Sequence, residues 1–150
     1  MFDCILVVGC GLIGSSILRA ISEKKISKKI IAYDKSKNVL NFLSTQKLNI
    51  EIARDLSLAA KKADLIIISA PLSAYKEIFF SIKNNFKKDV IITDTGSAKK
   101  EINKIIDNLN LSDISWIASH PIAGTEDSGP KAGFAKLFEK RWCIICLLYT

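Results

Sequence analysis

Proline, glycine and long apolar runs are scarce in this sequence. Three prolines and seven glycines in 150 residues are too few for a fibrous or low-complexity protein. No uninterrupted apolar run approaches the roughly 18 residues of a membrane-spanning helix. The first apolar run follows Asp3 instead of a basic segment, so it does not resemble a secretory signal peptide. With 49% hydrophobic residues, we expect one globular domain in the cytoplasm, with no membrane partner.

Arginine is also rare. The net charge of +7 comes from lysines, because only Arg19, Arg54 and Arg141 contribute guanidinium groups. Nucleic-acid surfaces are typically clustered, rich in arginine and interleaved with exposed aromatic residues, whereas these lysines are scattered as pairs. We therefore expect no nucleic-acid partner, and the positive field favours anionic small molecules.

The sequence lacks a full set of metal ligands. Cys143 and Cys146 form a C-x-x-C pair, but no second pair of cysteine or histidine residues completes four ligands. Residues 142–149 form an apolar run that predicts a buried strand, whereas a metal knuckle needs a turn and a redox motif needs a helix start. We expect no metal, and cysteines that are buried and reduced.

Short apolar runs alternate with longer amphipathic segments along the chain. The runs are nearly continuous in Ile, Val and Leu, which is typical of parallel strands covered on both faces. The predicted strands are residues 4–8, 30–33, 50–53, 64–69, 90–93, 115–119 and 142–148. Apolar stripes predict helices around residues 13–21, 39–43, 78–86 and 102–109, with Ser73 and Ser97 at N-cap positions. The alternation indicates a doubly wound α/β fold with a mainly parallel sheet.

The first predicted strand runs into Gly9-Cys10-Gly11-Leu12-Ile13-Gly14, a G-x-G-x-x-G motif that opens a helix. The first glycine permits a tight turn, the second lets backbone approach a pyrophosphate, and the third lets the helix pack close to the strand. Free N–H groups at the helix N-terminus then face the phosphates. This context predicts a dinucleotide-binding domain of the Rossmann type over residues 1–150.

Asp34 follows Gly14 by 20 residues and ends the second predicted strand. A carboxylate at this place accepts hydrogen bonds from both ribose hydroxyls and repels a 2′-phosphate, which favours NAD over NADP. Lys35 and Lys37 weaken that preference, because a nearby lysine partly accommodates the phosphate.

Polar side chains follow three predicted strands, and the ends of parallel strands converge on one cleft. They are Ser69-Ala70-Pro71-Leu72, residues 93–97 and residues 119–126. His120 is the only histidine in the chain and stands at a strand end before Pro121. An imidazole is the natural base for removing a hydroxyl proton as hydride leaves. Asp94 is expected to be a turn acceptor, and Ser97 either a helix cap or a partner of His120.

Three stretches, VGCGLIGSS (8–16), TDTGSAK (93–99) and SHPIAGTEDSG (119–129), together resemble the prephenate dehydrogenase family, which includes arogenate and cyclohexadienyl dehydrogenases. The third stretch is the most particular. The resemblance implies NAD-dependent oxidative decarboxylation of prephenate or arogenate in tyrosine synthesis. It gives His120 the role of base and Ser97 that of orienting the hydroxyl. The other implied contacts are Thr125 and Glu126 with substrate, and Ala70, Pro71 and Thr95 with cofactor.

Members of that family carry a helical second domain that supplies the dimer interface, so the resemblance implies a homodimer for the full-length protein. The chain ends after its last predicted strand, which leads us to expect a truncated domain. Two alternatives stay open. One is another dehydrogenase of the same fold, such as a β-hydroxyacid dehydrogenase, whose base is typically a lysine on a later helix. The other is a non-catalytic NAD-binding module.

Overall fold

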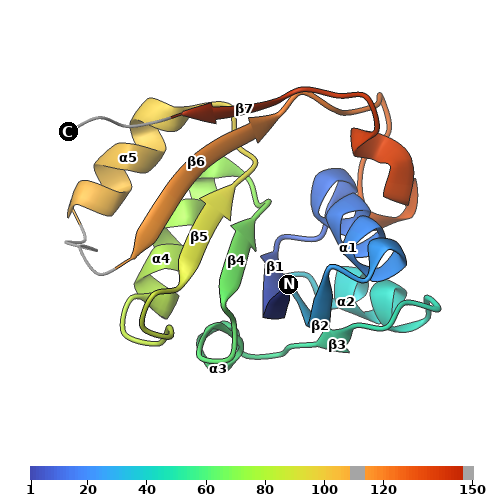
Figure 1. Cartoon of the computed structure of the whole chain (residues 1–150), viewed down its shortest axis with the longest axis horizontal. Coiled ribbons are helices and arrows are strands. Elements are labelled where there is room, and N and C mark those ends of the chain that lie inside the picture. The colour runs from blue at the N-terminus through green and yellow to red at the C-terminus, as the bar shows by residue number, and fades with distance from the viewer. Residues whose placement is uncertain (109–113, 147–150) are drawn as a thin grey trace.

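A computed structural model describes residues 1–108 and 114–146. A seven-stranded sheet runs through these residues in the order β3-β2-β1-β4-β5-β6-β7 (Figure 1). Its strands are β1 (Phe2–Val8), β2 (Ser27–Tyr33), β3 (Glu51–Ile52), β4 (Leu65–Ile68), β5 (Ile91–Asp94), β6 (Ser115–Pro121) and β7 (Cys143–Cys146). The first six strands are parallel, and β7 pairs antiparallel with β6. The predicted doubly wound α/β fold is confirmed.

Helices cover both faces of the sheet. The α-helices are α1 (Leu12–Lys24), α2 (Lys37–Ser44), α3 (Leu56–Ala60), α4 (Tyr75–Ile82) and α5 (Lys99–Asn108), and short 3-10 turns are η1 (Leu72–Ala74), η2 (Pro130–Ala132) and η3 (Ala135–Phe138). Alternate residues of β1 serve the two layers, because successive side chains of a strand point to opposite faces. Leu6 and Val8 pack with the α3–α5 layer, and Ile5 and Val7 pack with the α1–α2 layer.

The strand order reverses between β1 and β4, which lie side by side at the centre of the sheet (Figure 1). In open α/β sheets, ligands bind beyond the carboxyl ends of the strands at such a reversal. The turn after β1 begins at Gly9, and the loop after β4 begins at Ser69. The topology therefore brings the glycine motif and the first polar cluster to the same edge.

Between β6 and β7 the chain leaves the sheet and packs against α1. The backbone N–H of Phe134 donates to Ser16 Oγ at 3.1 Å, and a Cβ at Gly133 would overlap Ser15 Oγ. Figure 1 shows this segment beside α1 before the chain returns to β6. This path places the residues after Glu126 next to α1 and away from β6. None of the helices in the described ranges is both long and apolar enough to cross a membrane.

Three local predictions are wrong. Cys143 is exposed, so the expectation of buried cysteines does not hold there. The run over residues 142–148 is not a buried strand within the described residues: β7 is an edge strand, Trp142 is 83% exposed, and Ile145 is 57% exposed. Pairing with β6 alone leaves its side chains uncovered. Ser73 is not an N-cap either, because the 3-10 turn η1 precedes α4, whose N-cap is Ala74.

Candidate functional site

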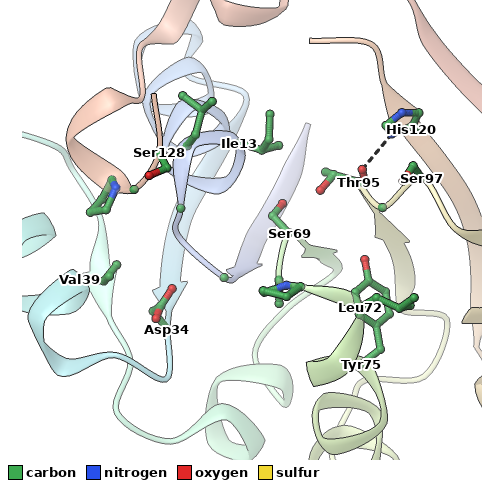
Figure 2. Close-up of a pocket in the computed structure, with 18 of the residues that line it drawn as sticks. Ile13, Asp34, Val39, Ser69, Leu72, Tyr75, Thr95, Ser97, His120 and Ser128 are labelled. Atoms are coloured by element: carbon green, nitrogen blue, oxygen red, sulfur yellow. Dashed lines mark hydrogen bonds between the residues drawn. The ribbon is translucent and has the colours of Figure 1, made fainter. Parts of the chain in front are cut away.

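A cavity of about 630 Å³ opens beyond the carboxyl ends of the central strands. Figure 2 shows Asp34 and His120 at opposite ends of it, with Ser69 between them. The predicted site residues that line it are Gly9, Gly11, Leu12, Ile13, Asp34, Ala70, Pro71, Thr95, Ser97 and His120. The structure therefore brings ten sequence-predicted residues from separate segments into one cavity. Because Asp34 and His120 lie at opposite ends of it, the arrangement suits an extended ligand.

The turn between β1 and α1 is built for close backbone approach. Gly9 has φ +86°, and a Cβ there would lie 2.7 Å from the backbone nitrogen of Ala70. Gly14 lies outside the cavity lining and packs under the turn, where a Cβ would overlap the Gly9 carbonyl oxygen. At Gly11 a Cβ would meet nothing within 4 Å among the described atoms. The start of α1 carries no side-chain cap, and Gly11, Leu12 and Ile13 at this start line the cavity, which is an arrangement suited to an anion.

Asp34 is half-buried at the end of β2. Its Oδ2 accepts the Cys10 N–H at 2.7 Å, and its Oδ1 accepts the Ser36 N–H at 2.8 Å. A carboxylate offers about four acceptor positions, so one position on each oxygen is left for a ligand. The Cys10 thiol is buried, and burial raises its pKa far above the usual value, which keeps the thiol protonated and unreactive.

A smaller, mostly apolar pocket of about 250 Å³ adjoins the first cavity and shares Asp34, Ala70 and Pro71 with it. Leu56, Ala74 and Ile78 contribute to its walls. At its rim, Lys35 Nζ forms an ion pair with Glu77 Oε2 at 2.9 Å. The volume and the apolar walls of this pocket suit a flat, weakly polar ring.

The Ser69 hydroxyl is buried in the wall of the cavity and has no hydrogen-bond partner among the described residues. Buried hydroxyls are normally paired, so an orphaned one that faces a cavity indicates a position where a ligand or solvent supplies the partner. It lies midway along the cavity in Figure 2. This side chain was predicted only as part of a polar cluster.

His120 projects from the end of β6, with its Nδ1 3.1 Å from the Thr95 carbonyl oxygen (Figure 2). A carbonyl oxygen only accepts hydrogen bonds, so Nδ1 carries the proton in the neutral ring. Nε2 then holds the lone pair. The ring is half-buried and lines the cavity together with the exposed Ser97. The arrangement orients a base toward the same cavity as the glycine turn.

A buried polar network lies beneath His120. The Asp94 side chain is fully buried and accepts from Lys99 Nζ at 2.6 Å, from the Gly96 N–H at 2.9 Å and from the Tyr75 hydroxyl at 3.2 Å. Burial and the adjacent carboxylate raise the pKa of Tyr75 far above its usual value, so the hydroxyl stays protonated and donates. The Gly96 contact confirms Asp94 as a turn acceptor.

Thr125 and Glu126 are exposed and are not among the residues that line the cavity, so their contact with substrate stays a prediction. The lining comes instead from the residues that follow them: Asp127, Ser128, Gly129 and Pro130. Gly129 has φ +82°, which turns the chain toward α1. Sequence reasoning missed this group, although the Ser-Gly-Pro turn was a usable signal. It also missed Tyr75, which an apolar helix pattern hides.

Comparison with known proteins supports one family. The family model for the prephenate dehydrogenase nucleotide-binding domain matches residues 17–148. A cyclohexadienyl dehydrogenase of Zymomonas mobilis is 38% identical over 139 residues, which cover 93% of this chain and 47% of that protein. A prephenate dehydrogenase of Lactococcus lactis is 32% identical, over 94% of this chain and 40% of that protein.

Among solved structures, a Synechocystis arogenate dehydrogenase superposes with a TM-score of 0.81 at 24% identity, over 95% of this chain and 49% of that one, which is a likeness of fold. The chain thus spans about half the length of the relatives it matches. Because the family model covers most of its residues, this chain belongs to the family of prephenate dehydrogenase nucleotide-binding domains.

Proposed function

We propose that this chain is the cofactor-binding part of an NAD⁺-dependent dehydrogenase that oxidatively decarboxylates prephenate or arogenate. The observation that carries the proposal is the placement of His120, whose Nε2 has no hydrogen-bond partner among the described residues, in the same cavity as the glycine turn and Asp34. The names of the relatives supply the substrate class, and a homodimer is proposed for the full-length protein on the family resemblance.

The residues present fit NAD⁺. The uncapped start of α1 suits the pyrophosphate, and the open space at Gly11 admits close approach. Asp34 keeps acceptor positions for the ribose hydroxyls, and the orphaned Ser69 hydroxyl lies on the path between Asp34 and His120. A prephenate dehydrogenase of A. aeolicus, 21% identical and alike in fold with a TM-score of 0.79, was solved with hydroxyphenyl propionate and NAD⁺. When bound, NAD⁺ supplies the hydride acceptor.

His120 provides the proton acceptor. Its Nε2 takes the proton of the substrate hydroxyl, and its Nδ1–H stays on the Thr95 carbonyl. The resulting imidazolium donates from both nitrogens, so the carbonyl continues to stabilise it. Ser97 orients the hydroxyl from the neighbouring wall of the cavity. Thr125 and Glu126 are assigned to the substrate only by the family resemblance. Free thiols at Cys4 and Cys10 favour a cytoplasmic location.

The full-length protein, mixed with NAD⁺ and either substrate, is expected to produce NADH absorbance at 340 nm. His120→Asn should abolish most turnover, by roughly a hundredfold or more, because general-base catalysis contributes about that much. It should leave NAD⁺ binding intact, since the Asn amide still donates to the Thr95 carbonyl. NAD⁺ binding without turnover in the full-length wild-type protein would favour a non-catalytic module. Full activity of His120→Asn would remove that residue from its role.

A further inference from the structure

The pairing between β5 and β6 changes character at its carboxyl end. The parallel ladder runs from Ile91↔Ser115 to Thr93↔Ile117. Beyond it, side chains hold the two segments together. The Ser119 N–H donates to Asp94 Oδ1 at 3.2 Å, and the Ser119 hydroxyl donates to the Asp94 carbonyl at 2.6 Å.

Lys99, at the start of α5, completes this connection. Its Nζ lies 2.6 Å from each Asp94 carboxylate oxygen and 2.5 Å from the Ser119 carbonyl oxygen. Three acceptors match the three protons of an ammonium group, so Lys99 has no donor left for a ligand. The Asp94 side chain is 0% exposed and that of Lys99 13% exposed, which places the pair out of bulk water. The geometry of Lys99 therefore argues against a role in substrate binding.

The ion pair of Asp94 with Lys99 is connected to both segments that hold His120. Ser119, which Lys99 and Asp94 bind, immediately precedes His120. Asp94 immediately precedes Thr95, whose carbonyl accepts from the His120 ring. The distance from imidazole to carbonyl therefore depends on the relative placement of two chain segments that the pair joins.

We propose that Asp94 and Lys99 are positioning residues for His120: their buried ion pair holds the ends of β5 and β6 so that the Thr95 carbonyl fixes the ring with its proton on Nδ1 and leaves Nε2 for the substrate. The inference rests on the proposed function, in which His120 is the base. Its structural content, the fixed tautomer, is independent of turnover.

The test uses the whole chain and its single histidine, whose ring nitrogens are identified by ¹⁵N NMR without further assignment. Protonated and unprotonated ring nitrogens are distinguished in alkaline solution, where imidazole is neutral. Lys99→Met leaves the Asp94 charge buried and unpaired, so we expect the Tm to fall by roughly 10 °C. The double variant Asp94→Asn with Lys99→Met removes both charges at similar volume and is expected to recover much of that loss.

The double variant separates positioning from folding. We expect wild type to carry its ring proton on Nδ1 and the folded double variant to show a mixture of Nδ1 and Nε2 tautomers. Lys104→Met, which breaks an exposed ion pair with Glu101 on the same helix, is the matched control and should keep the wild-type pattern.

A double variant that retains the wild-type tautomer would overturn the proposal, and so would a wild-type ring protonated on Nε2. The NMR measurement needs neither cofactor nor substrate. Absence of NADH production by the full-length protein, with an intact Nδ1 tautomer in this chain, would count against the proposed function and leave the positioning role standing.

Discussion

Two aspartates end strands at the same edge of the sheet and are used in opposite ways. Asp34, after β2, is half-buried and accepts one backbone N–H on each oxygen. Asp94, at the end of β5, is fully buried and accepts from an ammonium group, a hydroxyl and two backbone N–H groups. The difference teaches how to read a carboxylate at the end of a strand. When acceptor positions are left over, as at Asp34, the carboxylate can bind a ligand. When all positions are filled by the chain, as at Asp94, it stabilises the fold.

The surroundings of the two residues follow the same division. Near Asp34, the glycine turn and the uncapped start of α1 leave backbone N–H groups free for a ligand. Near Asp94, Lys99 and Ser119 link neighbouring segments through side chains. The Asp34 end of the cavity therefore keeps hydrogen-bonding positions open, whereas the carboxylate of Asp94 and the ammonium group of Lys99, next to the other end, are already paired within the chain.

The largest effect is expected when the framework carboxylate is removed. Asp94→Ala leaves the mostly buried Lys99 ammonium unpaired and takes the acceptor from Tyr75, so the free energy of unfolding should fall by about 3–5 kcal/mol. Asp34→Ala should cost only about 1 kcal/mol, because it removes two backbone contacts at a half-buried place. Urea denaturation of both variants measures the contrast. Equal losses would erase the distinction between the two aspartates.

A smaller effect, on the affinity for NAD⁺, is expected when the Asp34 carboxylate is replaced. Asp34→Asn removes charged acceptors for the ribose hydroxyls, worth about 1.5–3 kcal/mol, so the Kd for NAD⁺ should rise by roughly ten- to a hundredfold. Calorimetric titration gives the value. Asp55→Asn is the matched control, because Asp55 caps α3 and is not among the residues that line the cavity, and this variant should bind NAD⁺ as wild type does. An unchanged Kd for Asp34→Asn would refute its assignment to the ribose.

A third effect concerns how fully Asp34 governs cofactor choice. Glu77 holds Lys35 at the pocket rim, in an exposed ion pair with side chains 65% and 80% exposed. Glu77→Gln removes a negative charge and releases Lys35, so the ratio of Kd for NADP⁺ to Kd for NAD⁺ should fall by roughly two- to fivefold. Glu101→Gln, on α5, provides the control. An unchanged or larger ratio of the two Kd values in Glu77→Gln would show that Lys35 does not reach a 2′-phosphate.

The smallest effect comes from a third aspartate, at the opposite end of a strand. Asp64 precedes β4, accepts the Cys4 N–H and pairs with Lys87 at 2.6 Å. The Lys87 contact, opposed in part by desolvation, lowers the pKa of the Asp64 carboxyl. Its stabilisation is thus present above the usual carboxylate pKa and lost as pH falls through the lowered value. Asp64→Asn should reduce the loss in the free energy of unfolding between pH 6 and pH 2 by a few tenths of a kcal/mol, measured by urea denaturation over that range.

Sequence reasoning predicted the ligand half of the site better than the framework half. Asp34 was identified because its predicted role follows from local spacing after the glycine motif, and the mainly parallel sheet follows from the alternation of strands and helices. The contacts of Asp94 with Lys99 and Ser119 depend on how two strand ends and a helix start meet in space, which no local pattern encodes. The apolar run at β7 predicted burial, but exposure there is decided by the neighbours of an edge strand.

Titration of the purified 150-residue chain with NAD⁺ and with NADP⁺ tests the central claim most directly, because it asks whether the edge built around Gly9 and Asp34 is a cofactor site. We predict saturable binding of NAD⁺ with a stoichiometry of about one per chain, a lower Kd than for NADP⁺, and a larger rise in Tm. No binding of NAD⁺, or a lower Kd for NADP⁺, would contradict the account.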